Sequence, residues 1–277
     1  MNTFLLILSD TVIDTLKIIP FLFLTYLFLE WMEHETGSRM ERFLERHQKL
    51  GPIAGAIFGL VPECGFSSAA SSLYATGIIS VGTLIAVYLS TSDEMLPIMI
   101  SQQAGWNRIW PFLLVKVTVA LIAGTLIDLW HPKKKSDIES FCQRENCDCE
   151  HGILHSALIH TLKITFWLLL VTLLMNSFVD LLGMDTIKAF VSAHLAYALL
   201  TSTLTGMIPS CASSIILTQL YLDAIIPFHA AAAGLLANAG VGMMVLFRVN
   251  RNLRNNLKII GTVWVISFAA GLILSLF

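Results

Sequence analysis

The stretch GLVPECGFSSAASSLYATGIISVGTLIAVYL at 59–89 decides the fold, because it recurs 147 residues later as GMIPSCASSIILTQLYLDAIIPFHAAAAGLL at 206–236. Ten of the 31 aligned positions are identical. Apolar composition alone would give about two or three identities, so the two halves of the chain are predicted to be copies of one structural unit.

The composition around this repeat indicates a membrane protein. Of the 277 residues, 56% are hydrophobic and 13% are charged, whereas roughly 25% are charged in a soluble domain. Apolar runs long enough to cross a bilayer separate a few polar stretches. The net charge of −2, with no basic domain, gives no support for nucleic-acid binding. No G-x-x-x-x-G-K-[ST] phosphate loop occurs, so we expect no ATPase activity.

The polar stretches predict an orientation, because Lys and Arg in short loops mark the cytoplasmic side. The basic ranges 33–49, 131–151 and 248–258 are therefore expected inside the cell. The ranges 101–108 and 176–187 are expected outside. Both termini would then also face outward.

This orientation requires an odd number of crossings between residues 50 and 100, and again between 188 and 247. Each stretch has room for three short or broken helices. We therefore predict an all-α, polytopic membrane protein of about ten transmembrane helices, arranged as two inverted repeats of five. The flanking spans are expected at 17–31, 109–130, 156–175 and 259–277. The predicted domains are a first repeat (1–130), a cytoplasmic linker (131–154) and a second, inverted repeat (155–277).

The motif P-x-C-x-x-S begins each copy of the repeated stretch. Pro62 and Pro209 remove a backbone donor and disfavour helix before them, and each is followed two residues later by a thiol, Cys64 or Cys211. Inverted repeats with proline-broken helices at matching positions are typical of secondary transporters, whose substrate site lies near the membrane midplane. The alternative is a plain proline kink with a small cysteine packed behind it.

Residues that differ between the copies are expected to carry substrate chemistry. Glu63 stands where the second copy has Ser210, and Asp93 and Glu94 also lie in apolar sequence. Carboxylates inside a membrane are costly unless they face a cavity or a partner. An interfacial loop is the alternative, chiefly for Asp93 and Glu94. The predicted substrate pathway comprises Glu63, Cys64, Cys211, Asn238, Asp93, Glu94, Ser67, Ser210 and Ser214.

Such a pathway mixes two kinds of metal ligand. Carboxylate, amide and hydroxyl oxygens suit hard cations such as Mn²⁺, whereas thiolates suit softer metals. Carboxylates there could exchange protons for the cation, because protonation weakens metal binding.

The linker predicts a second metal-binding element. Cys142, Cys147, Cys149 and His151 follow the spacing C-x4-C-x-C-x-H, which is not a standard zinc-finger spacing. Clustered thiols in the reducing cytoplasm bind metal more often than they form disulfides. A tether with incidental cysteines is the alternative.

The sequences GLVPECGFSSAASSLYATGIISVGTLIAVYLSTSDEMLPIM (59–99) and TGMIPSCASSIILTQLYLDAIIPFHAAAAGLLANAGVGMM (205–244) resemble a bacterial family described as ten-helix heavy-metal exporters. Members of that family are frequently labelled manganese transporters, and it is distantly similar to the organoarsenical permeases. The resemblance covers essentially the whole chain. It implies an inner-membrane permease of ten helices that expels a metal or metalloid.

The leading hypothesis is a secondary-active exporter of a divalent transition metal, with manganese first and protons as the coupling ion. One alternative is a permease for an arsenical or a reduced sulfur species, with Cys64 and Cys211 as the main contacts. Another is a membrane subunit that transports nothing. No enzyme is predicted, since neither H-E-x-x-H nor G-x-S-x-G occurs. The expected partners are the bilayer, the substrate and protons, with self-association left open and no resident cofactor beyond a metal at the linker.

Overall fold

The computed structural model describes residues 12, 16, 19–20, 22–24, 26–27, 50–61, 64–92, 94–130, 153–182 and 197–276. Within these residues every regular element is an α-helix, which confirms the predicted all-α class. The first half contains α3 (Gly51–Phe58), α4 (Cys64–Ala75), α5 (Val81–Ser90), α6 (Met95–Ser101) and α7 (Trp106–Trp130). The second half contains α9 (Ile153–Leu182), α11 (Ala198–Gly206), α12 (Cys211–Leu222), α13 (Phe228–Ala237), α14 (Gly242–Val249) and α15 (Leu253–Leu274).

The helices recur at the interval found in the sequence. α3 and α11 begin at Gly51 and Ala198, which are 147 residues apart. The same interval of 147 residues separates the first residues of α4 and α12, of α5 and α13, of α6 and α14, and of α7 and α15. The five helix starts therefore agree with the sequence repeat. Inversion of one copy relative to the membrane stays a prediction.

Four described segments are long and apolar enough to cross a membrane: Val81–Ser101, Trp106–Trp130, Phe228–Val249 and Leu253–Leu274. The first joins α5 to α6 and the third joins α13 to α14, so each of these two is a broken span. With α3 and α4 before the first, and α11 and α12 before the third, each half has the short and broken helices expected of it.

The long helices extend further than the predicted spans. α7 begins at Trp106 and α15 at Leu253, inside stretches that were expected to be loops, and α9 continues to Leu182. Asn252 starts α15, because its side chain accepts a hydrogen bond from the Asn255 N–H at 3.2 Å. Hydropathy marks where the apolar layer ends, whereas a helix ends where its backbone is capped.

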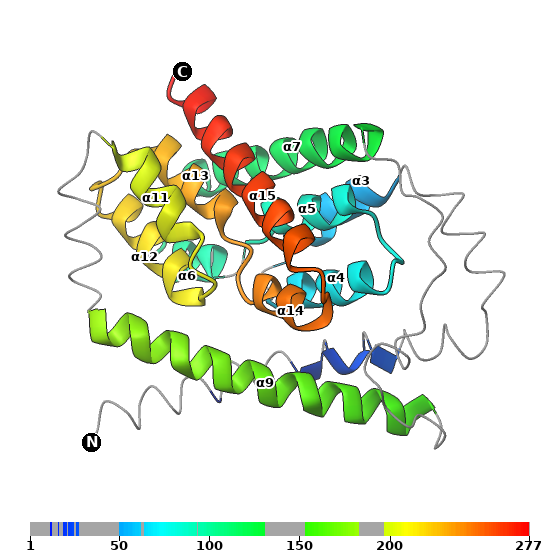
Figure 1. The fold of residues 1–277 in the computed structure, drawn as a ribbon. Helices are drawn as coiled ribbons and strands as arrows, with labels where there is room; N and C mark the ends of the chain where they lie inside the picture. The colour runs from blue at the N-terminus through cyan, green and yellow to red at the C-terminus, as the bar shows by residue number, and fades with distance from the viewer. Residues whose placement is uncertain are drawn as a thin grey trace.

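The two repeats interlock instead of packing as separate units. α5 and α7 pack together in the first repeat, as α13 and α15 do in the second. α4 of the first repeat packs against α14 of the second, and reciprocally α12 packs against α6. Figure 1 shows this exchange, with α14 beside α4 and α6 beside α12. Such reciprocal contacts are those of a two-fold relation between like units.

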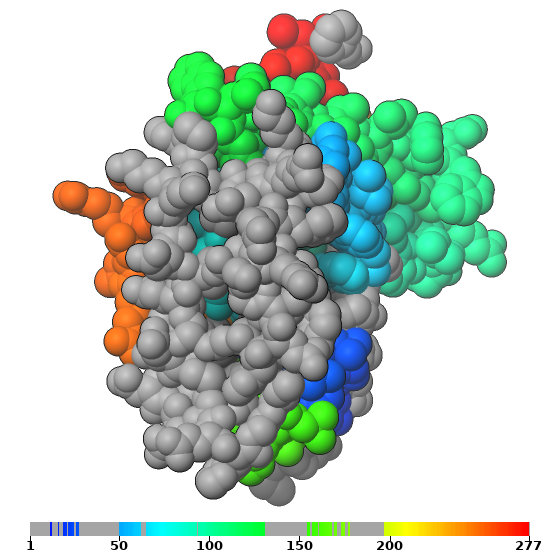
Figure 2. Space-filling model, turned by 90° about the vertical axis from the view of Figure 1, so that its right-hand side faces the viewer, coloured from blue at the N-terminus to red at the C-terminus, as the bar shows by residue number. Residues whose placement is uncertain are grey.

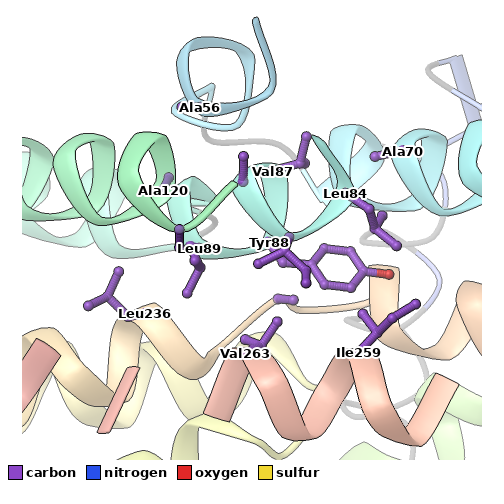
Figure 3. Packing of buried hydrophobic residues seen from close by; sticks show 14 of the residues in the cluster. Ala56, Ala70, Leu84, Val87, Tyr88, Leu89, Ala120, Leu236, Ile259 and Val263 are labelled. Carbon is purple, nitrogen blue, oxygen red and sulfur yellow. The ribbon is translucent and has the colours of Figure 1, made fainter. Parts of the chain in front are cut away.

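The largest core cluster lies between the repeats, around the middle of α5. Leu84, Tyr88 and Leu89 of α5 are fully buried, and they pack with Ile259 and Val263 of α15. Figure 3 shows these side chains facing one another across the gap between the two ribbons. A second cluster joins α4 and α14 to α9 and to the described helical residues near the N-terminus.

Backbone contacts between α11 and α13 depend on glycine. A Cβ atom on Gly206 would overlap the carbonyl oxygen of Gly234, so the two helices approach closely at this point. Small residues at such crossings are typical of helix packing in membranes, where close van der Waals contact drives association.

The turns after α4 and after α12 use a left-handed residue at equivalent positions. Gly77 has φ 79°, and Ala224, which stands 147 residues later, has φ 56°. Glycine adopts this conformation without cost, whereas alanine does not. The first copy therefore has the better residue for the turn.

The outer surface is apolar along the long helices. Trp106, Trp110 and Trp130 of α7 are each more than half exposed, and Figure 2 shows α7, in teal and green, on the outside of the molecule. α9 exposes an apolar residue at every fourth position: Leu154, Leu158, Leu162, Phe166, Leu170 and Leu174. Faces of this kind suit lipid better than water.

Candidate functional site

Two core helices end in extended backbone at repeat-equivalent residues. α5 ends at Thr91 with φ −52° and ψ 126°, and α13 ends at Asn238 with φ −87° and ψ 101°. A helix end leaves its last carbonyl groups without helical partners. Thr91 and Asn238 are each only 2% exposed, so other groups of the protein or a ligand must satisfy these carbonyls.

Lys116, on α7, connects the two ends. Its side chain is 2% exposed, and its ammonium donates to the Leu235 carbonyl oxygen at 2.9 Å and to the Thr91 carbonyl oxygen. Leu235 lies in the last turn of α13, so the ends of both helices reach one ammonium group. We call Thr91, Leu235, Asn238 and Lys116 the central break.

The Asn238 side chain, in the central break, has only part of its hydrogen-bonding capacity satisfied by the described residues. Its Oδ1 accepts a hydrogen bond from the Gly240 N–H at 2.9 Å. Gly240 has φ 55°, which allows this tight turn. The Nδ2 group has no hydrogen-bond partner among the described residues. A buried amide of this kind is expected where a ligand or water binds.

A hydroxyl network lies beside the central break. The Ser71 Oγ is 2.7 Å from the Tyr88 hydroxyl and 2.8 Å from the Gly242 carbonyl oxygen, to which the Tyr88 hydroxyl also donates at 3.1 Å. Gly242 follows Asn238 by four residues and has Ser67 directly against it. α4 therefore brings its hydroxyl groups to the segment that breaks α13 from α14.

The serine hydroxyl groups at the start of α12 form hydrogen bonds within the first turn of that helix. Ser210 Oγ accepts a hydrogen bond from the Ala212 N–H at 3.2 Å and so caps the helix. Ser214 Oγ donates to the Cys211 carbonyl oxygen at 2.9 Å. Cys211 is partly exposed. Ser210 and Ser214 thus stabilise the first turn of α12.

Metal-ligand side chains do not cluster in the part of the chain that the structure describes: no group of three or more His, Cys, Asp or Glu residues could hold an ion there. The ligand atoms that gather at the central break are hydroxyl, amide and backbone carbonyl oxygens, and the Lys116 ammonium binds two of these carbonyls, those of Thr91 and Leu235.

A family described as "Putative, 10TM heavy-metal exporter" matches residues 1–151 and 115–252 of the chain. The chain belongs to this family. Heavy-metal export is therefore its function at the family level, in a multi-pass membrane protein of a transporter class and not of an enzyme class. No curated protein and no solved structure matches it.

For this heavy-metal exporter, several predicted site residues lie outside the described part of the chain. These are Pro62, Glu63, Asp93 and the linker residues Cys142, Cys147, Cys149 and His151. Cys64 is the first residue of α4, and its side chain is also outside the description. Glu94 lies directly before α6 and is partly buried, and Pro209 lies in the bend before α12. Of the predicted pathway, Asn238 is part of the central break, Glu94 follows Thr91 by three residues, and Ser67 lies against Gly242.

Two features in and beside the central break are absent, wholly or in part, from the predicted pathway. Lys116 is the basic residue in the middle of the span predicted at 109–130, and a charge there is a signal of function in itself. The four serines of α4 were represented by Ser67 alone, although Ser67, Ser68, Ser71 and Ser72 are all fully buried. Their spacing at one helical face in an apolar stretch was the available signal.

Proposed function

We propose that this heavy-metal exporter is a secondary-active exporter of a divalent transition metal, with manganese as the leading candidate and protons as the coupling ion. The bacterial inner membrane is its proposed location. The proposal is supported by the family match, by the paired helix breaks and by the oxygen donors that surround them.

The observation that carries the proposal is Asn238. Its amide is buried, lies at the point where α13 breaks, and has an unpartnered Nδ2 among the described residues. The Oδ1 has a second lone pair beyond the one that accepts from Gly240. Amide, hydroxyl and carbonyl oxygens are ligands that hard cations such as Mn²⁺ prefer.

The proposed coupling depends on carboxylates near the breaks. Glu94 is partly buried and follows Thr91 by three residues, and Glu63 and Asp93 are proposed to join it in the pathway. A protonated carboxyl binds a cation poorly, so protons that enter from the outer side would release the metal there.

Transport in proteoliposomes tests this proposal. Wild-type protein is expected to transport Mn²⁺ in exchange for protons that flow down their gradient. Glu94→Gln is expected to weaken the dependence of Mn²⁺ transport on that gradient. Ser275→Ala, at an exposed position beyond α15, serves as the matched control. Total-metal analysis of cells with and without the gene, under graded Mn, Zn, Fe, Co and arsenite, identifies the cargo. No difference in any of these elements would rule out the exporter and favour the subunit that transports nothing.

A second candidate, export of a thiophilic metalloid, is favoured by one observation at α12. Cys211 presents a partly exposed thiol, and the Asn238 Nδ2 can donate to a hydroxylated solute. Arsenite transport should then fall with Cys211→Ser and with Cys64→Ser, whereas Mn²⁺ transport should not. An equal loss of both activities would contradict the thiophilic proposal.

The proposed topology places the linker in the cytoplasm and both termini outside. In a background with Cys64→Ser and Cys211→Ser, the remaining cysteines are Cys142, Cys147 and Cys149. These should resist an impermeant thiol reagent in intact cells and react after permeabilisation. Labelling from outside would overturn the orientation of the repeats.

Metal capture by the linker is tested with a variant in which Cys142, Cys147 and Cys149 are all replaced by serine. If this variant retains as much zinc or manganese as the wild type, the linker does not capture metal through these thiols.

A further inference from the structure

Lys116 is a buried ammonium at a helix position where the second repeat has an apolar residue. The residue 147 positions later, on α15, is Val263, which is fully buried in the core. One copy of the repeat therefore fills this helix position with an apolar side chain. A charge in the membrane interior is costly, so a lysine at this position is expected to have a role that the valine of the second repeat does not have.

The acceptors of Lys116 would suit a free cation. They include the carbonyl oxygen of Thr91, at the end of α5, and that of Leu235 in the last turn of α13. Helix C-termini carry partial negative charge and favour a cation within the last turn. Two such ends converge at the Lys116 Nζ, and unwound carbonyls at helix breaks are the groups that coordinate coupling ions in secondary transporters.

We propose that the Lys116 ammonium occupies a monovalent-cation site formed by the carbonyl oxygens of Thr91 and Leu235, and acts there as a tethered substitute for a soluble coupling cation. The exporter then needs no Na⁺ at this position. Removal of the side chain opens a site for a small free cation such as methylammonium or Na⁺. The role in transport rests on the proposed function, but occupancy of the site does not.

Thermal unfolding of purified protein without heavy metal tests occupancy. In Lys116→Ala the truncated side chain leaves space, and methylammonium is expected to raise the unfolding midpoint by several degrees, because it binds the folded state alone. Wild type and Lys116→Met should not respond, since the site is filled in both. Lys163→Ala, at an exposed position on α9, is the matched control and should not respond either. N-methylglucamine, which is too large for the site, should have no effect on any variant.

The proposal is overturned if methylammonium shifts none of these proteins, or shifts all of them alike. If Lys116→Ala can be purified only with methylammonium present, that requirement supports the site. If it cannot be purified under either condition, the charge is tested with Lys116→Arg and Lys116→Gln. The proposal is supported if Lys116→Arg retains transport and Lys116→Gln does not. It is contradicted if the two variants transport equally well.

Transport is the second readout. Lys116→Ala should export Mn²⁺ poorly in N-methylglucamine and recover in methylammonium or Na⁺, while wild type should be indifferent to Na⁺. If wild type moves no metal at all, the proposed function fails, and the unfolding experiment still decides the cation site. If a folded Lys116→Ala protein binds methylammonium without recovering Mn²⁺ export, that result supports the cation site and contradicts its role in transport.

Discussion

Two buried asparagines are expected to respond to truncation in opposite ways. Asn238 is 2% exposed and its Oδ1 accepts from the buried Gly240 N–H, but its Nδ2 has no partner in the described part of the chain. Asn238→Ala removes an unpaired donor, which recovers about 1–3 kcal/mol, and orphans the Gly240 N–H, which costs a similar amount, about 1–3 kcal/mol. The two contributions oppose each other, so the net change is at most about 2 kcal/mol, or roughly 4–8 °C in the unfolding midpoint.

Asn256 is the matched control, because it is fully buried and fully bonded. Its Oδ1 accepts from the Asn250 Nδ2 at 2.6 Å, and its Nδ2 donates to the Asn250 carbonyl oxygen at 2.9 Å. Asn256→Ala leaves both Asn250 groups without these partners, at a cost of about 3 kcal/mol, or roughly 6–12 °C.

Thermal unfolding in detergent, followed by tryptophan fluorescence, gives the stability of each variant, and Mn²⁺ flux in proteoliposomes gives its activity. Asn238→Ala should keep its midpoint within roughly 8 °C of the wild type and lose transport, by about 10- to 100-fold in metal affinity if the amide contacts the cargo. Asn256→Ala should lose stability and keep transport per folded molecule. An Asn238→Ala protein that transports normally, or that is destabilised as much as Asn256→Ala, would refute the assignment of Asn238 to the substrate site.

Three further predictions concern stability, and each is measured by the same unfolding assay. Ala224→Gly should stabilise the fold by about 1 kcal/mol, because it removes an alanine from the left-handed conformation, and Gly77→Ala should destabilise the fold by a similar amount. If both substitutions shift the free energy of unfolding in the same direction, this reasoning is wrong. Gly206→Ala should destabilise by forcing α11 from α13, while Gly261→Ala, which would meet nothing within 4 Å, should be neutral or stabilising by up to about 1 kcal/mol. Asp128→Ala should cost about 3 kcal/mol, because the carboxylate accepts from the Ser80 hydroxyl at 2.6 Å and from the Gly82 N–H at 2.9 Å, at the start of α5; an unchanged midpoint would show that solvent replaces both bonds.

Much of the helical framework could be predicted from local sequence signals. The all-α class, the membrane character and the repeat interval of 147 residues follow from composition and self-similarity, and the helix starts agree with that interval. The asymmetry between Gly77 and Ala224 was also readable, once the copies were aligned. Helix ends were predicted less well: α7 and α15 start within presumed loops, because caps such as Asn252 act outside the apolar stretch.

The candidate site was predicted only in part, for a reason that its residues make plain. Asn238 could be selected because it stands in an apolar stretch, but the sequence does not say that its Nδ2 lacks a partner. The bonds of Lys116 join residues that are 25 and 119 positions apart in the chain. Helix periodicity reports which face is apolar, and it carries no information about which distant carbonyl a buried side chain will reach.

The sequence by itself therefore determined that this protein is a helical, membrane-embedded repeat with an interval of 147 residues between its copies. Only the tertiary structure decided that α4 packs on α14 and α12 on α6, and that the ends of α5 and α13 meet at a single ammonium. The physical reason is one of range. Backbone conformation and burial pattern are local properties of the chain, whereas the satisfaction of a buried polar group depends on segments that only the folded packing brings together.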